Sequence, residues 1–154
     1  MRVARMLGAA AAAVLAIAAP AAASPPTEGS GAGAVVVRVP TETRTADGNT
    51  IQVRETDGVV TGAFDGTFQQ VVRGVIHKDG FVTFHGFMTF TGVAGDCGAG
   101  TITLEVEGRG FAAGVIEGRL RTIDQASNTI DVHVIGTFQE TLTAITYEGQ
   151  FHCD

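Results

Sequence analysis

The stretch from Phe64 to Gly92 constrains the fold more than any other part of the chain. It contains two apolar runs in which apolar residues alternate with a period of about two, separated by His77-Lys78-Asp79-Gly80. Aspartate and glycine tolerate the positive φ angles that a tight hairpin requires. The pattern therefore predicts a long antiparallel hairpin. Because most of the phenylalanines lie in this stretch, we expect the core to form around it.

Similar short runs, rich in β-branched and aromatic residues, recur along the chain between turn signals. We expect strands at 35–39, 50–56, 59–77, 81–91, 101–107, 115–123, 130–143 and 145–153, with a turn at Asp57-Gly58. No segment after residue 23 has the 3.6-residue apolar period of a helix. The sequence thus predicts an all-β protein, an antiparallel closed β-barrel of about eight strands, with a β-sandwich as the alternative.

The first 23 residues have the features of a signal peptide. Arg2 and Arg5 precede an apolar, alanine-rich segment, and Ala21-Ala22-Ala23 provides a small-residue cleavage site. We therefore expect export by the general secretory route to the extracellular space, with no stable membrane insertion after cleavage. The proline-, glycine- and serine-rich residues 24–33 are predicted to be a disordered leader, and residues 34–154 a single barrel domain.

Cys97 and Cys153 are the two cysteines of the chain. An even number of cysteines in an exported protein indicates a disulfide, and two buried thiols are the alternative. The formal net charge is −6, and cleavage of the signal peptide would remove two further positive charges. This acidity argues against nucleic acid as a partner, since the phosphate backbone would be repelled.

A resemblance to a known family rests on glycine and phenylalanine spacing. It is carried by residues 62–68 (GAFDGTF), 77–80 (HKDG), 84–92 (FHGFMTFTG), 98–101 (GAGT) and 149–151 (GQF). Over residues 50–154 the chain resembles bacterial secreted domains that share the allene oxide cyclase-like barrel. The resemblance implies an eight-stranded barrel with a central cavity, in which the plant cyclases rearrange a reactive fatty-acid epoxide. The catalytic-strand motifs of those cyclases are not recognisable here, so no catalytic residue is carried over.

The residue types limit the chemistry available to the mature chain. No Gly-x-Ser-x-Gly motif, metal-binding histidine spacing or phosphate-binding loop is present, so we predict neither a metal site nor a cofactor. Strand alternation places Glu140 on the face of Phe138, Gln70 on the face of Phe68, and Glu55 on the face of Val53. Glu140 and Glu55 are candidate acid–base residues; Phe68, Gln70, Phe138 and Glu140 are candidate ligand contacts. Glu140, Glu55 and Gln70 all lie near strand ends, so the alternative is that these three side chains face solvent.

Other charged residues are expected on the outer surface. Glu105 and Glu107 alternate against an apolar face, and Glu117, Arg119 and Arg121 alternate in the same way on the next run. Across a hairpin these side chains could form an exterior ladder of charges.

Three functions remain compatible with the sequence. The first is a secreted protein that binds a small apolar molecule in the barrel or acts through its outer surface. The second is a cyclase or isomerase that shapes a reactive lipid-like or polyketide-like substrate in the cavity. The third is a secreted inhibitor or interaction module. A cavity of several hundred Å³ would favour binding or catalysis inside the barrel, whereas an interior filled by phenylalanines would favour the outer surface.

Overall fold

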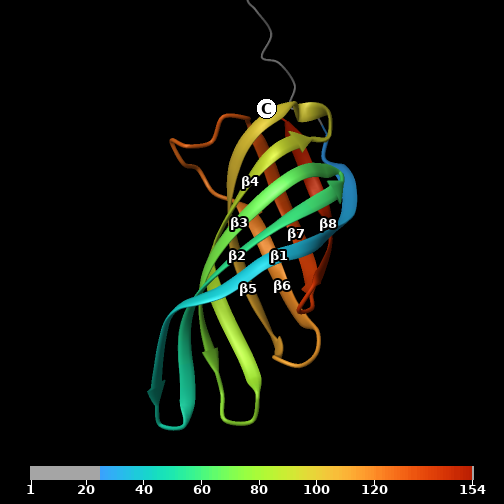
Figure 1. The fold of residues 1–154 in the computed structure, drawn as a ribbon. Helices are drawn as coiled ribbons and strands as arrows, with labels where there is room; N and C mark the ends of the chain where they lie inside the picture. Colours follow the sequence, from blue (N-terminus) through green and yellow to red (C-terminus); the bar gives the residue numbers. More distant parts are fainter. Residues whose placement is uncertain (1–24, 154) are drawn as a thin grey trace, which may run out of the picture.

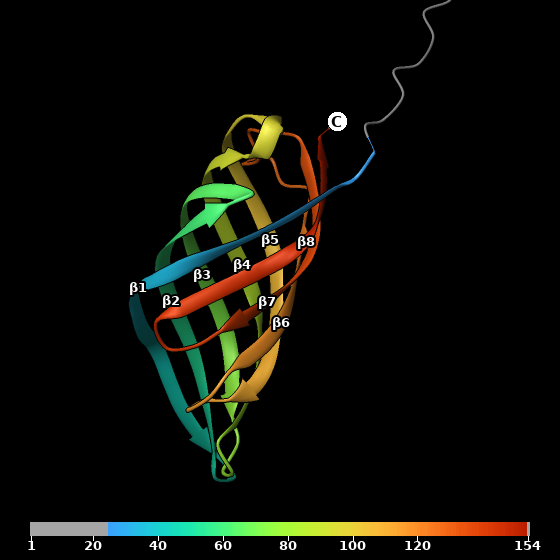
Figure 2. The same ribbon diagram turned by 90° about the vertical axis from the view of Figure 1, so that its right-hand side faces the viewer.

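The computed structural model describes residues 25–153, which form a closed antiparallel barrel of eight strands (Figures 1 and 2). The predicted signal peptide, residues 1–23, lies outside the described residues. Each strand pairs with its neighbours in the sequence, and the last pairs with the first. The strands are β1 (Thr27–Ala46), β2 (Asn49–Gly62), β3 (Phe64–Ile76), β4 (Phe81–Ala94), β5 (Ala99–Phe111), β6 (Ile116–Thr122), β7 (Val132–Glu140) and β8 (Ala144–Cys153), with a short 3-10 turn, η1 (Gly95–Cys97), between β4 and β5. The predicted barrel, rather than the sandwich, is confirmed.

Phenylalanine rings fill the interior, as the alternation along the strands predicts. Phe64 lies near the centre of an aromatic group, making edge-on contacts with Phe90 at 5.4 Å and Phe151 at 5.6 Å between ring centroids. Leucine, isoleucine, valine and methionine from the other strands complete the core. Edge-to-face pairs of this kind add stability beyond the apolar area that they bury.

Several rings lie directly against a glycine of a neighbouring strand. A Cβ atom at Gly58 would lie 2.4 Å from the ring of Phe68, and one at Gly118 would lie 2.2 Å from the ring of Phe138. Both distances are far below van der Waals contact. The inward-facing glycines thus provide the space that the rings occupy, which is how a barrel this narrow holds so many aromatic side chains.

The disordered leader predicted for residues 24–33 is wrong from Thr27 onward, because this segment is the beginning of β1. Residues Thr27–Ala34 pair with Phe151–Ala144 of β8 and close the barrel. Gly31 faces inward, and the Tyr147 side chain occupies the space beside it. The Tyr147 hydroxyl donates to the carbonyl oxygens of Thr61 and Phe64 and accepts from the Phe64 amide.

The turn predicted at Asp57-Gly58 is also wrong. Both residues lie within β2, where Gly58 pairs with Phe68, and the chain instead turns at Ala63. Gly62 precedes this turn with a φ of 111°, a value that glycine adopts readily and other residues rarely. Gly58 is a glycine because it packs against a ring and not because the chain reverses there.

The predicted disulfide between Cys97 and Cys153 is confirmed. It joins η1 to the end of β8, at the end of the barrel where the C-terminus lies (Figure 1). The bond closes a loop with a sequence separation of 56 residues. A loop of that length is worth about 4 kcal/mol of stability in the chain-entropy model.

At the opposite end, the β1–β2 and β3–β4 hairpins extend beyond the shorter strands (Figure 1). Beyond Ala34, β1 pairs with β2 but no longer with β8, so this part of it is a sheet edge. The edge carries Pro40 and two interruptions of register, at Val35/Val37 and Pro40/Glu42. Proline and bulges are common devices by which an exposed strand avoids pairing with another chain.

We expect Gly31→Ala to destabilise the protein by about 1–3 kcal/mol, the usual cost of overpacking. The added Cβ would lie 2.1 Å from the Thr61 carbonyl oxygen and 2.2 Å from the Tyr147 hydroxyl. Urea unfolding with the disulfide intact measures the change. Ser30→Ala, at an exposed neighbouring position, is the matched control. Equal stability of the two variants would show that this segment is not packed into the barrel.

Candidate functional site

The apolar interior contains a small cavity of about 50 Å³. Its walls include Phe64, Phe68, Met88 and Leu120. Pockets that bind drug-sized ligands have volumes of about 300–1,000 Å³, so this cavity is far too small for such a molecule. Of the predicted ligand contacts, Phe68 lines the cavity, whereas Phe138 is buried against Gly118 outside it.

A second interior feature is polar and lies toward the end of the barrel that carries the long hairpins. It comprises Arg38 of β1, Arg54 and Thr56 of β2, Gln70 of β3 and Glu140 of β7, hereafter the polar cluster. Gln70 and Glu140 are 1% and 2% exposed, and Thr56 is 1% exposed. Arg38 pairs in register with Thr56, and Thr56 with Gln70, so three neighbouring strands place these side chains side by side. Gln70 and Glu140 are therefore buried on the inward faces of β3 and β7, and the solvent-facing alternative for these two residues is wrong.

The Arg38 guanidinium forms an ion pair with the Glu140 carboxylate. It also donates to the Thr141 carbonyl oxygen at 3.4 Å. These contacts lie just beyond the last β1–β8 pair, Ala34 with Ala144, and the Val35 amide that donates to Thr143. Arg38 therefore holds β1 against the β7–β8 connection at the point where the backbone ladder stops.

Burial dominates the electrostatics of Glu140. Removal of the carboxyl from water raises its pKa above the ordinary value, and the positive charges of Arg38 and then Arg54 oppose that rise. Arg54 experiences the converse: burial, and then the charge of Arg38, lower the pKa of its guanidinium, while Glu140 raises it. The cluster thus holds two partly buried guanidinium groups around one buried carboxyl.

Glu55, the other predicted acid–base candidate, does not reach the interior. It is exposed on the outside of β2, between Val39 of β1 and Val71 of β3. The inward face of β2 carries Arg54, Thr56 and Gly58 instead, so the alternation that we expected along this strand has the opposite phase. Ile51 and Val53 suggested the wrong face because β2 is only partly buried at that end.

Sequence reasoning missed Arg38 and Arg54. Arg38 follows three valines within an apolar run, and Arg54 alternates with Thr56 and Gly58. Both residues could have been identified from their position on the inward face, in register with a buried residue of a neighbouring strand. That signal is usable only once the inward face of the strand is known.

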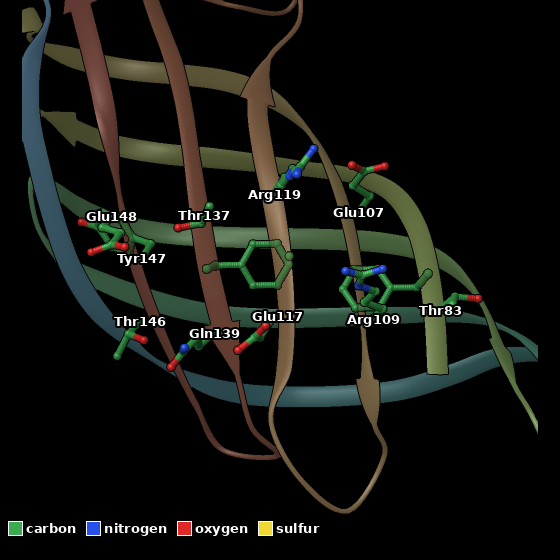
Figure 3. Close-up of a pocket in the computed structure, with 14 residues that line it drawn as sticks. Thr83, Glu107, Arg109, Glu117, Arg119, Thr137, Gln139, Thr146, Tyr147 and Glu148 are labelled. Carbon is green, nitrogen blue, oxygen red and sulfur yellow. The ribbon is translucent and has the colours of Figure 1, made fainter. Parts of the chain in front are cut away.

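The outer surface carries a broad groove of about 820 Å³ across β4 to β8 (Figure 3). Its rim and walls are polar, with the outward-facing side chains of Thr83, Glu107, Arg109, Glu117, Arg119, Thr137, Gln139, Thr146 and Glu148. A second hollow of about 900 Å³ continues it and shares Glu107, Arg119, Thr137 and Glu148. We call the first of these hollows the outer groove.

The predicted exterior ladder of charges is confirmed by the register of β5 and β6. Glu105 lies opposite Arg121, Glu107 opposite Arg119, and Arg109 opposite Glu117. Glu105 accepts hydrogen bonds from His85 and Arg121, which hold the pKa of its carboxyl below the ordinary value. The other two rungs, which line the outer groove, form no ion pair in the part of the chain that the structure describes.

Residues 25–153 contain no helix that is long and apolar enough to cross a membrane. Within the same residues, no group of three or more histidine, cysteine, aspartate or glutamate side chains is placed to hold a metal ion. Comparison of the chain with known protein families and with curated proteins finds no match.

We expect Arg38→Met to destabilise the protein by about 3–5 kcal/mol, because removing one partner leaves the other charge buried without compensation. Adding Glu140→Gln to that variant should recover part of the loss, since the orphaned carboxyl is then neutral. Denaturant unfolding of both single variants and the double variant measures the coupling. Strict additivity of the two substitutions would contradict an energetic link between Arg38 and Glu140.

The raised pKa of Glu140 predicts a particular pH dependence. A carboxyl whose pKa is higher in the folded than in the unfolded state contributes stability at low pH, and loses it as the pH rises through the folded-state value. Wild-type protein should therefore lose stability relative to Glu140→Gln as the pH rises from about 4.5, the ordinary value. Glu105→Gln is the control with the opposite sign: because the pKa of Glu105 is lowered, wild type should gain stability relative to this variant as the pH rises toward about 4.5, and little further above it. Thermal unfolding at a series of pH values measures the stability of wild type relative to each variant. A change of the same sign with rising pH for both variants would contradict the prediction.

Proposed function

We propose that this protein is an extracellular binding module that acts through its outer surface, with the outer groove as the contact region. The observation that carries the proposal is the contrast between the two hollows. The interior cavity has about 50 Å³ and apolar walls, whereas the outer groove has about 820 Å³ and charged walls. A drug-sized ligand has room in the outer groove, whereas the interior cavity is far too small for it.

The chemistry of the groove favours a polypeptide partner that carries charges of both signs. Glu107, Glu117 and Glu148 alternate with Arg109 and Arg119 around it (Figure 3). None of the three aromatic rings that line the groove projects outward: Phe84 and Phe138 are buried, and the Tyr147 hydroxyl is bonded to the backbone at Thr61 and Phe64. Stacking of a sugar or a base is therefore not supported, while arginine-containing polar surfaces are common in protein–protein interfaces.

Export and ancestry belong to the same proposal. The basic and apolar segment at residues 1–23 and the disulfide both support secretion by the general route. The strand number and antiparallel closure are compatible with an allene oxide cyclase-like barrel. The cyclase or isomerase alternative receives less support, because the buried acid Glu140 does not line the interior cavity and that cavity is too small for a lipid-like substrate.

Site-specific photo-crosslinking in the native culture medium tests the proposal. A photoreactive amino acid at position 137, within the outer groove, should give a polypeptide adduct that Arg119→Glu abolishes. The same photoreactive group at position 67, exposed on β3, is the matched control and should give none. Recovery of a mature chain that begins at residue 24 would support export.

Two results would overturn the proposal. One is equal crosslinking from positions 137 and 67, which would show that the groove has no preference. The other is a small apolar molecule that co-purifies with the protein in native mass spectrometry and is unaffected by Arg119→Glu, which would place the ligand inside the barrel.

A further inference from the structure

The polar cluster contains more hydrogen-bond donors than the protein satisfies. Four buried atoms have no partner among the described residues: Arg38 Nε, Arg54 Nε, Thr56 Oγ1 and Gln70 Nε2. All four atoms can donate a hydrogen bond. The two arginine Nε atoms and Gln70 Nε2 can only donate, whereas the Thr56 hydroxyl can also accept. Buried donors without acceptors are costly, so a native structure normally supplies them with a partner. What this group lacks is an acceptor.

The charges of the cluster are unbalanced in the same sense. Arg38 lies close enough to Arg54 to lower the pKa of that guanidinium, yet the two arginines face a single carboxyl, Glu140. Even with Glu140 ionised, the cluster would carry a net positive charge inside the barrel. Glu140 is already committed to Arg38 through the ion pair that holds β1 at the seam.

Two side chains of the cluster are partly exposed to solvent. The Arg38 side chain retains 15% exposure, and Arg54 is half-buried. Both lie where β1 has left β8, toward the end with the long hairpins. A small solute can therefore reach the arginines without crossing the phenylalanine core.

From these observations we propose that the polar cluster is a binding site for one small oxyanion, held by Arg54, Gln70 and Thr56 beside the Arg38–Glu140 pair. Such an anion supplies the missing acceptors and the missing negative charge together. A guanidinium group recognises carboxylate and phosphate with similar geometry, so the shared chemistry is that of a small oxygen anion. An ordered water molecule is the competing occupant, because it could accept these hydrogen bonds but would leave the charge uncompensated.

Arginine side-chain NMR on the full mature protein tests this proposal. Sodium formate and sodium phosphate are titrated separately, at constant ionic strength set with sodium chloride. The Nε–H resonances of Arg38 and Arg54 should shift along a saturable curve with one anion or with both. Saturation with formate would identify the bound anion as a carboxylate, and saturation with phosphate would identify it as a phosphate. The Nε–H resonance of Arg119, on the outer surface, is the internal control and should not saturate.

Variants separate a bound anion from a structural role. Gln70→Met keeps the size of the side chain and removes the donor, and Arg54→Lys keeps the charge and removes Nε. Each substitution should lower the affinity of the protein for the anion about tenfold, the loss expected for one hydrogen bond to a charged group. Amide fingerprint spectra establish that both variants remain folded.

The outcomes that overturn the proposal are distinct. A shift that rises linearly without saturation, or one that Arg119 shares, would mean only general screening by salt. No shift at Arg38 or Arg54 would mean that ordered water satisfies the cluster. Unchanged affinity in both Gln70→Met and Arg54→Lys would place the anion elsewhere.

Discussion

The pairing of β1 with β8 is the constraint on which the rest of this structure depends. Residues Thr27–Ala34 supply the backbone partners of β8, and without them the sheet would have two free edges and an open interior. Where the ladder ends, Arg38 continues the connection through Glu140 and the Thr141 carbonyl. The disulfide between Cys97 and Cys153 secures the other end of the same strand, β8. Closure is thus reinforced by a covalent bond at one end and by a buried ion pair at the other.

A closed barrel must fill its interior, and this one does so by placing rings against glycines. The fit of Phe68 on Gly58 and Phe138 on Gly118 leaves only a small apolar void. That packing has a functional consequence. Some barrels of this size hold a small ligand in the interior, but here side chains occupy that space. What remains available is the charged outer groove over β4 to β8 and the polar cluster near the hairpin end. Both depend on the same alternation, which sends one face of each strand inward and the other to solvent.

Much of the fold was predictable from local pattern, and the errors have definable physical causes. Alternation assigned Gln70, Phe68, Phe138 and Glu140 to the correct faces, because β3 and β7 each have one buried and one largely exposed face. Glycine was the main source of error. The glycines at positions 29, 31 and 33 suggested a flexible leader, and Gly58 suggested a turn. In the structure each of these glycines packs against a side chain of an adjacent strand. The sequence of one strand does not reveal which ring lies on the next. The inward face of β2 was assigned wrongly because a partly buried strand has two faces of similar polarity. For the same reason the sequence did not identify Arg38 and Arg54 as interior residues.

Hydrogen exchange of the β1 amides is the most direct test of this account. If residues Thr27–Ala34 close the barrel, their amides bonded to β8 should exchange far more slowly than those of an unstructured peptide, and within Gly31–Ala34, which has a strand on both sides, as slowly as those of β5. The amides of the Asp47-Gly48 turn provide the fast-exchanging reference in the same spectrum. Protection across Thr27–Ala34 would establish the closed and filled barrel. Exchange there at the rate of an unstructured peptide would contradict it, and with it the assignment of function to the outer surface.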